Sequence, residues 1–575
     1  MSGPPDANAL LAAADERQLS GDLAGAIALY DRLLALDPFI WPAYANRGLA
    51  RAVAGDGAAA RADFRRALTV DPCAGPALRN LADSLQTLAP ASALIPARAL
   101  VALAPMAADS WLSLGAAALG LGRSPVAARA LRRAAVLAPS LADCLTGLGV
   151  VAAATDRIWF ERALAIAPDL PPLLALARHS HALHDRRTAW RHLRRALALA
   201  PGSAEVLLEV TMVIEDAETL HRWAYRAHLF APDSPAILNN LGTAAVALGR
   251  LEEAERCFAA AIRHRADFAE AHFNRATPLF LLGRMGEAWG EYEWRWRVDR
   301  FETPPTDAPR WGGEDLRGRR LLVHEEQGLG DTLQFVRYLP LLATRHRNLA
   351  FLCHPRLAHL LQESFPAIEI HARPALPPHE VAAPLLSLPL LLGEADHAPP
   401  AAPYLKRPTP HGIDAQGRLR IGLVWSGNPA HPRNRERSIP LAQLSSWLAI
   451  PGIAWFSMLF GPGTADIAEA GFETRLADLG SSLPDLRDVA AALAGLDLLI
   501  SVDTAFCHLA GALGLPVWTM LAQVPDWRWG MKGAATPWYP SMRLFRQPAR
   551  GAWQPVVAEV EAALVALKRA KPPNI

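Results

Sequence analysis

Cysteine is scarce in this sequence, and its few copies stand far apart. None of them forms a CxxC pair or lies at a Cys/His spacing typical of zinc ligands. This excludes a disulfide scaffold, argues against a structural zinc site, and suits a reducing cytoplasm, where we expect the protein to reside. The five cysteines are Cys73, Cys144, Cys257, Cys353 and Cys507.

An excess of charge of either sign is also missing. Lys and Arg number 58 against 56 Asp and Glu, which gives a formal net charge of +2. This balance, together with a hydrophobic fraction of 51%, excludes a disordered tail protein and a polybasic nucleic-acid binder. We expect a large globular protein without a nucleic-acid partner.

Long hydrophobic runs are absent as well. The first twenty residues lack the basic start and the uninterrupted apolar stretch of a secretion signal. The most apolar segment, 382–393, is too short to cross a membrane and contains Pro384 and Pro389. It is better interpreted as a buried loop with a short strand, and no membrane span is expected.

The N-terminal half repeats a phrase in which an Ala-rich helical stretch is followed by proline. The spacing of these prolines varies between 29 and 34 residues, close to the period of about 34 residues of tetratricopeptide repeats, whose unit is a pair of antiparallel helices. The array should therefore occupy residues 1–300, followed by a linker over 301–319. The prolines are Pro38, Pro72, Pro105, Pro139, Pro168, Pro201 and Pro232.

Small and bulky residues recur within the period. Gly115 and Gly242 mark the first helix of a pair, whereas Phe64 and Phe258 mark the second, so we expect the bulky residue to fill the gap to the next repeat. Stacked pairs form a right-handed superhelix whose concave groove usually holds a peptide or protein, although a pure spacer or a dimerisation array remains open. A break in the pattern over 155–160 predicts a bend.

The C-terminal half changes to short apolar runs that alternate with helical segments. Runs at 320–326 and 348–354 with a helix between them predict a first β-α-β unit over 320–410. A second series begins at 419–427 and continues to a final helix over 554–569, which predicts a second unit over 411–575. Two Rossmann-like units that face each other across a cleft describe the GT-B architecture of many nucleotide-sugar transferases.

The first candidate site is the strand-to-helix turn that contains Gln327, Gly328, Gly330 and Asp331. The glycines permit close approach of the backbone to a ligand, and a helix start favours an anion. Asp331 could equally be an ordinary helix cap, because the third glycine of the dinucleotide fingerprint is missing.

The second candidate site follows the strand that ends in Trp425, Ser426, Gly427 and Asn428. The loop after it carries several arginines and Ser438, and guanidinium groups pair well with a diphosphate. A solvated basic loop is the alternative. The arginines are Arg433, Arg435 and Arg437.

The third candidate site is a strand that delivers Asp503 and Thr504 to the start of the next helix. Backbone N–H groups at that start suit a phosphate, and Gly511 allows the helix to pack closely. His508, one turn into the helix, is either a ligand contact or a packed histidine. Downstream, an aromatic and basic loop could line the cleft with Asp526, Trp527 and Arg528.

These segments together resemble a known family. QGLGDTLQF, WSGNPAH with RSIP, SVDTAFCHLAG and PDWRW with TPWYP are similar to tetratricopeptide-repeat proteins whose C-terminal domain is related to family 9 glycosyltransferases, the heptosyltransferase group. The resemblance covers essentially the whole chain. Its two-part layout is also similar to that of O-linked N-acetylglucosamine transferases and of bacterial flagellin glycosyltransferases.

The resemblance implies an inverting, metal-independent glycosyltransferase with Asp331 as general base. Asp503, Thr504, His508 and Gly511 fall in the segment that binds the nucleotide phosphate. A lysine that family members use near the diphosphate has no counterpart here, and Arg437 is the nearest candidate. The repeat groove would select a protein Ser or Thr, flagellin being one acceptor implied by the resemblance, and the nucleotide-sugar would be a co-substrate, with no resident cofactor or metal.

Two other functions stay open at this point. The transferase-like half could be inactive, so that the chain is a scaffold, or the acceptor could be a lipid or a polysaccharide. The sugar, the nucleotide and the oligomeric state, including a homodimer, are not decided by the sequence.

Overall fold

The structure is a computed structural model that describes residues 7–86, 88–139, 141–151, 157–298, 305–431, 433–459 and 465–570. The chain divides into two compact units, Met1–Ile214 and Glu215–Ile575. The predicted break over 155–160 and the predicted linker over 301–319 fall partly outside the described residues.

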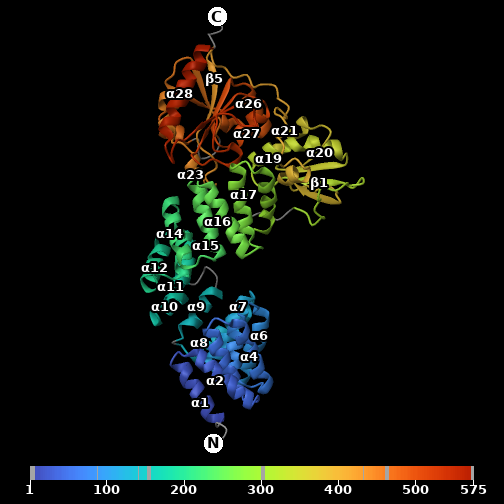
Figure 1. Ribbon diagram of the computed structural model, residues 1–575. Coiled ribbons are helices and arrows are strands. Elements are labelled where there is room, and N and C mark those ends of the chain that lie inside the picture. Colours follow the sequence, from blue (N-terminus) through green and yellow to red (C-terminus); the bar gives the residue numbers. More distant parts are fainter. Residues whose placement is uncertain are drawn as a thin grey trace. The chain divides into compact units, whose positions relative to one another are not determined.

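The first unit consists of helices that pack in consecutive antiparallel pairs (Figure 1). Its helices are α1 (Ala7–Leu19), α2 (Leu23–Leu36), α3 (Trp41–Val53), α4 (Gly57–Val70), α5 (Gly75–Leu85), α6 (Pro90–Leu103), α7 (Ala108–Gly120), α8 (Ser124–Leu137), α9 (Ala142–Val151), α10 (Arg157–Ile166), α11 (Leu170–Ala182), α12 (Arg186–Leu199) and α13 (Ala204–Val213).

Each repeating proline stands two residues past the end of the second helix of a pair, for example Pro72 after α4 and Pro139 after α8. Proline is favoured there because it cannot continue a helix. The repeat prediction is thereby confirmed at the level of the elements.

The small and bulky positions meet inside a pair, and the bulky residue also packs toward the next pair, since Phe64 shares a hydrophobic core with Leu81 of α5. A Cβ on Gly48 would lie 2.7 Å from the ring of Phe64, and one on Gly242 would lie 2.8 Å from the ring of Phe258. Glycine on the first helix therefore makes room for the aromatic residue of the second helix.

The second unit begins with further helix pairs and continues into an α/β region. The helices are α14 (Ala217–Phe230), α15 (Pro235–Ala247), α16 (Leu251–His264), α17 (Ala269–Leu281), α18 (Met285–Tyr292) and the 3₁₀ turn η2 (Glu293–Arg297). Phe280 and Trp289 of these helices belong to the same hydrophobic core as Leu321 and Val323 of the first sheet. This shared core explains why the compact boundary lies at Ile214 and not near residue 300.

The first sheet has the order β3-β2-β1-β4, and all of its strands are parallel. Its elements are β1 (Leu321–His324), α19 (Leu329–Phe335), η3 (Val336–Tyr338), α20 (Leu339–Arg345), β2 (Leu349–Cys353), α21 (Pro355–Ser364), β3 (Glu369–Ala372), β4 (Val381–Pro384), η4 (Leu385–Ser387) and α22 (Leu388–Leu391). The apolar segment 382–393 thus forms a short buried strand with two helical turns after it.

The second sheet has the order β10-β9-β8-β5-β6-β7, again with parallel strands. Counted from its first strand this is the doubly wound order 3-2-1-4-5-6, in which ligands bind where the order reverses. Its elements are β5 (Leu419–Val424), α23 (Asn434–Arg437), η5 (Leu441–Leu444), α24 (Ser445–Leu448), β6 (Ile453–Ser457), α25 (Ala465–Glu469), β7 (Leu476–Asp478), η7 (Gly480–Ser482), α26 (Leu486–Ala494), β8 (Leu498–Val502), α27 (Ala505–Ala512), β9 (Val517–Leu521), η8 (Trp527–Trp529), β10 (Met542–Arg546) and α28 (Trp553–Ala570).

Candidate functional site

A cavity of about 960 Å³ in the second unit is lined by the turns that follow β1, β5 and β8. These strands flank the points where the strand orders of the two sheets reverse. Thirteen of the predicted site residues line it: Gln327, Gly328, Gly330, Asp331, Ser426, Gly427, Asn428, Arg437, Asp503, Thr504, His508, Asp526 and Arg528.

The turn after β1 holds an unusual backbone. Gln327 has a positive φ of 62°, in the left-handed region that residues other than glycine rarely adopt. Its side-chain Nε2 donates a hydrogen bond of 2.6 Å to the hydroxyl of Tyr292, at the end of α18. The repeat helices of the second unit thus fix the conformation of the turn, and local strain of this kind is often found at functional sites.

Asp331 has two roles at this turn. Its Oδ2 accepts a hydrogen bond of 2.9 Å from the N–H of Gly328, the N-cap residue of α19, so the capping interpretation is correct in part. Its other oxygen accepts from the Arg528 guanidinium, which arrives from the second sheet. The carboxylate also lines the cavity and keeps about 22% of its side-chain surface exposed.

Arg528 contacts two carboxylates whose pKa values are shifted in opposite directions. It is buried and also donates to Asp526 Oδ1 over 2.9 Å. Burial raises the pKa of Asp331, although Arg528 and the Gly328 N–H oppose this shift. Burial also opposes ionisation of Asp526, but the Arg528 guanidinium and N–H groups prevail and lower the pKa of that carboxyl. Asp331 is therefore the carboxylate of the pair that is better suited to accept a proton.

The first turn of α27 faces the turn after β1 at close range. A Cβ on Gly330 would lie 3.1 Å from Cδ2 of His508 and 3.5 Å from Cα of Ala505. Only glycine permits this approach without a shift of its neighbours. The two helix starts, α19 and α27, consequently border the same cavity.

His508 is held as a neutral ring. It is buried, stacks on Trp529 with ring centroids 5.1 Å apart, and its Nδ1 lies 3.0 Å from the hydroxyl of Tyr539. Burial lowers its pKa to about 3. The histidine is therefore packed, as one of the two alternatives from the sequence states, and it also borders the cavity, while its contact with a ligand stays a prediction.

The start of α27 combines backbone donors with an aspartate whose ionisation is disfavoured by burial. Thr504 is the N-cap with extended backbone, and the first-turn N–H groups of a helix lack intrahelical acceptors. Burial raises the pKa of Asp503, and the nearby Asp526 adds to the shift while Arg437 opposes it. Both features reduce the negative potential that an incoming anion would meet.

Arg437 is the cation of the cavity without a carboxylate partner in the described part of the chain. Its buried Nε has no hydrogen-bond partner there. A Cβ on Gly427 would lie 2.7 Å from its Nη2, so glycine is required for the guanidinium to lie over this backbone. Asn434 holds the loop in place by accepting from the Gly427 N–H over 3.1 Å.

Four predicted residues do not reach the cavity wall. Trp425 is fully buried and donates to Asp466 over 2.7 Å, while Ser438 lies behind Gly427 and accepts its N–H at 3.4 Å. Gly511 packs under the ring of Tyr539, where a Cβ would be only 2.5 Å from it. Trp527 stacks on Phe280 of α17 at 4.1 Å instead of covering a ligand. These four residues support the site from behind.

The sequence reasoning missed several lining residues. His354 follows β2 and Arg373 follows β3, so the rule that ligands bind at the carboxyl ends of parallel strands could have found both. Arg373 pairs with Glu325 over 2.8 Å. Further lining residues that were not predicted are Arg356, His431, Asn434 and Asp466.

A buried ion pair ties the repeat helices to the turn after β1. Arg295 of η2 has no exposed side-chain surface and donates twice to Glu326, at 2.7 Å each. It also reaches the Ser387 hydroxyl at 2.8 Å. The last helices of the repeat region are therefore part of the framework of the site.

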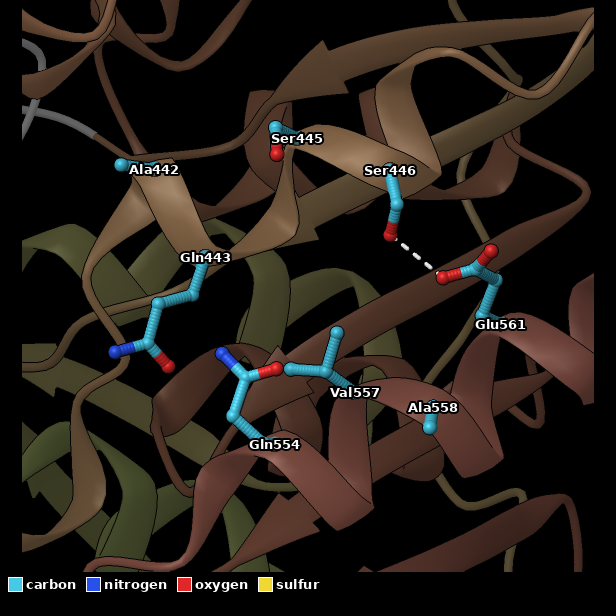
Figure 2. A pocket seen from close by; sticks show the side chains of 8 residues that line it. All are labelled: Ala442, Gln443, Ser445, Ser446, Gln554, Val557, Ala558 and Glu561. Atoms are coloured by element: carbon cyan, nitrogen blue, oxygen red, sulfur yellow. Dashed lines mark hydrogen bonds between the residues drawn. The ribbon is translucent and has the colours of Figure 1, made fainter.

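A smaller hollow of about 480 Å³ lies between η5, α24 and α28 (Figure 2). Its polar groups are the side chains of Gln443, Gln554 and two serines, together with Glu561, which accepts from Ser446 over 2.6 Å. No basic side chain lines this hollow, whereas several arginines line the larger cavity.

The described residues contain neither a metal-binding cluster nor a helix that could span a membrane. No group of three or more His, Cys, Asp or Glu side chains in the described ranges is arranged to hold a metal ion. No helix within those ranges is both long and apolar enough to span a bilayer.

A repeat family and one relative match parts of this chain. The tetratricopeptide repeat family model matches residues 11–75 and 239–293, which confirms the repeat prediction there. The chain is 31% identical over 371 residues to protein FlbA of Caulobacter vibrioides. That match covers 58% of this chain and 62% of FlbA, so the chain spans less than two thirds of that relative.

Solved helical-repeat structures are more distant. The Cut9-Hcn1 hetero-tetramer of APC/C is 17% identical and covers 47% of this chain and 56% of its own, with a TM-score of 0.37. PilW, a type IV pilus biogenesis factor, is 20% identical and covers 36% of this chain and 98% of its own, with a TM-score of 0.32.

Proposed function

We propose that the second unit is an inverting, metal-independent glycosyltransferase of the GT-B type, which uses a nucleotide-sugar donor. The observation that carries the proposal is the single cavity into which Asp331 of the first sheet and the start of α27 of the second sheet both open. A general base and an anion-binding helix start that open into one cavity are what displacement at an anomeric carbon requires.

The donor diphosphate would bind between α27 and Arg437. The helix start supplies backbone donors, and the guanidinium forms no ion pair with a carboxylate of the described residues and has an unpartnered Nε. These groups would stabilise the negative charge that develops on the leaving phosphate. One preorganised donor of this kind contributes on the order of 3 kcal/mol to transition-state stabilisation.

Asp331 would take the proton of the acceptor hydroxyl. The hydroxyl oxygen then forms a bond to the anomeric carbon while the bond from that carbon to the phosphate oxygen breaks, and the nucleotide leaves with the electron pair. Arg528 and the Gly328 N–H hold the carboxylate in place. The raised pKa of Asp331 makes it a stronger base than an exposed aspartate.

The repeats would present a protein Ser or Thr to this base. The support is the family match of the repeats, since tetratricopeptide arrays commonly bind proteins. Flagellin stays one acceptor suggested by resemblance alone. In this proposal the nucleotide-sugar is a co-substrate, the protein resides in the cytoplasm, and a homodimer is compatible with it.

The donor site can be tested by measuring the thermal stability of the purified chain with added ligands. The ligands are a panel of nucleoside diphosphates, CMP and their sugar conjugates. A ligand present at about a hundred times its Kd adds about 2.7 kcal/mol of stability. A selective shift that persists in EDTA supports the proposal and identifies the nucleotide. If no member of the panel shifts the transition, the scaffold function is the better account.

The acceptor class can be tested by deletion. Removal of residues 1–300 would also remove Arg295 and the core residues of α17 and α18, so the cut belongs at Ile214. Once circular dichroism shows that 215–575 is folded, transfer to a lipid or polysaccharide should survive the deletion. Transfer to a protein that docks on the first unit should not.

A further inference from the structure

A third cavity, of about 380 Å³, lies in the first unit. It is formed by the first helices of three successive pairs, α5, α7 and α9, with one side chain of α8 as part of its floor. Among its lining residues are Arg79, Asp83, Asp109, Ser113, Leu131 and Asp143. All of them belong to Met1–Ile214.

The walls of this cavity carry an excess of negative charge. Asp109 pairs with Arg79 over 2.9 Å, the only cation among the lining residues. Neither Asp83 nor Asp143 forms an ion pair in the part of the chain that the structure describes. Asp83 accepts only a hydrogen bond of 3.1 Å from its neighbour Gln86.

The preceding helix pair shows the opposite arrangement. There Asp63 is almost fully buried and is neutralised by both Arg47, at 2.5 Å, and Arg51, at 2.9 Å. Within the described ranges, Asp83 and Asp143 therefore lack the kind of arginine partners that neutralise Asp63.

Asp83 also lies at a position where a negative charge destabilises the helix. It lies in the last turn of α5, where the partial negative charge of the helix end repels a carboxylate. Asp109 and Asp143, by contrast, lie in the first turns of α7 and α9, where a carboxylate is favoured. Helix capping can explain the latter two, but it does not explain Asp83.

The floor of the cavity offers an unused hydroxyl and apolar surface. Ser113 is only 7% exposed, lines the cavity, and makes no hydrogen bond within the described ranges. Leu112 and Leu131 lie beside it. The side chain of Leu131 can reach the floor because a Cβ on Gly147 would come within 2.9 Å of it.

We infer that this cavity binds a lysine or arginine side chain of a partner protein segment. The aliphatic stem of such a residue would pack on Leu112 and Leu131, its cationic head would reach Asp83 and Asp143, and Ser113 Oγ would accept one of its N–H groups. The inference names the chemistry of the partner of the first unit. It holds whether or not the second unit transfers a sugar.

The test uses the full chain and a fluorescein-labelled Gly/Ser/Ala dodecapeptide with four lysines. Companion peptides carry glutamine or glutamate at the same four positions. Fluorescence anisotropy at low salt should show binding of the lysine peptide at least tenfold tighter than binding of the glutamine peptide, and no binding of the glutamate peptide. Equal affinity for the lysine and glutamine peptides overturns the inference, as does any preference for glutamate.

Substitutions in the cavity test whether the lysine peptide binds there. Asp83→Asn should weaken binding of the lysine peptide several-fold while the melting temperature stays equal or rises, because the variant removes an unfavourable charge from the end of α5. Glu16→Gln is the matched control, since Glu16 is an exposed carboxylate in the last turn of α1 and lies outside the cavity. Should the double variant Asp83→Asn/Asp143→Asn, folded by circular dichroism, bind the lysine peptide as the wild type does, the assignment of this cavity is wrong.

Discussion

Replacement of Arg437 by glutamine should separate ligand binding from folding. Arg437 lies over the backbone of Gly427 and faces the larger cavity, and its Nε has no partner in the described part of the chain. Its removal therefore costs the folded protein no hydrogen bond at that atom. In a complex with a diphosphate the same guanidinium would make charge-assisted hydrogen bonds.

The expected magnitude follows from these bonds. A hydrogen bond to a charged group contributes about 1.5–3 kcal/mol, and a loss of about 2 kcal/mol weakens binding roughly 30-fold. At a ligand concentration of about a hundred times the wild-type Kd, the stabilisation by ligand would fall from about 2.7 to about 0.9 kcal/mol. Stability without ligand should be unchanged within about 0.5 kcal/mol.

Thermal unfolding with and without the nucleotide identified in the panel measures both quantities. Arg435→Gln is the control, because Arg435 is an exposed arginine of the same loop that does not line the cavity. If Arg437→Gln and Arg435→Gln lose the same amount of ligand stabilisation, the assignment of Arg437 to the diphosphate is refuted.

Three further outcomes are expected. Burial raises the pKa of Asp331, and the base must be ionised to act. As the pH is lowered, kcat/KM should therefore begin to fall above about pH 3.9, the pKa of a free aspartate. A kcat/KM that does not change between about pH 4 and pH 8 would contradict this. Gly330→Ala places a Cβ 3.1 Å from His508 Cδ2 and should cost about 1–3 kcal/mol in urea denaturation, whereas a neutral effect would show that the two turns are not in contact. Arg295→Met leaves the Glu326 carboxylate buried without its cation and should lower the free energy of unfolding by about 3–5 kcal/mol in the same assay. Adding Glu326→Gln to this variant should restore part of that free energy. If the effects of the two substitutions simply add, the two side chains do not form a stabilising pair.

The repeat helices and the inner strands could be predicted because their signals are local. A proline two residues past a helix end and an apolar run such as that of β8 depend on a few neighbouring residues. The edge strands β3, β7 and β10 were missed; the side chains of β3 and β7 are mostly half-buried or exposed, so their apolar signal is weak. An edge strand is stabilised from one side only, so its sequence is less constrained.

The contacts that define the candidate site could not be predicted from the sequence, for a different reason. Asp331 and Arg528 are separated by 197 positions, and nothing in either local sequence indicates that they pair. Trp527 was assigned to the cleft from its neighbours, but its ring meets Phe280 of the repeat helices. Tertiary packing, which a single sequence does not reveal, decided both outcomes. Most of the residues that were placed well stand in the turns that follow β1, β5 and β8, where topology alone brings them together.

The role of Asp331 is tested most directly by nucleotide release from the donor. Wild-type protein and Asp331→Asn would be incubated with the nucleotide-sugar selected by the thermal panel and with proteins retained by the immobilised chain. The account predicts that both bind the donor, and that release dependent on the retained proteins is at least about a hundredfold slower in the variant. Equal release by the two proteins would contradict the assignment of Asp331 as the base.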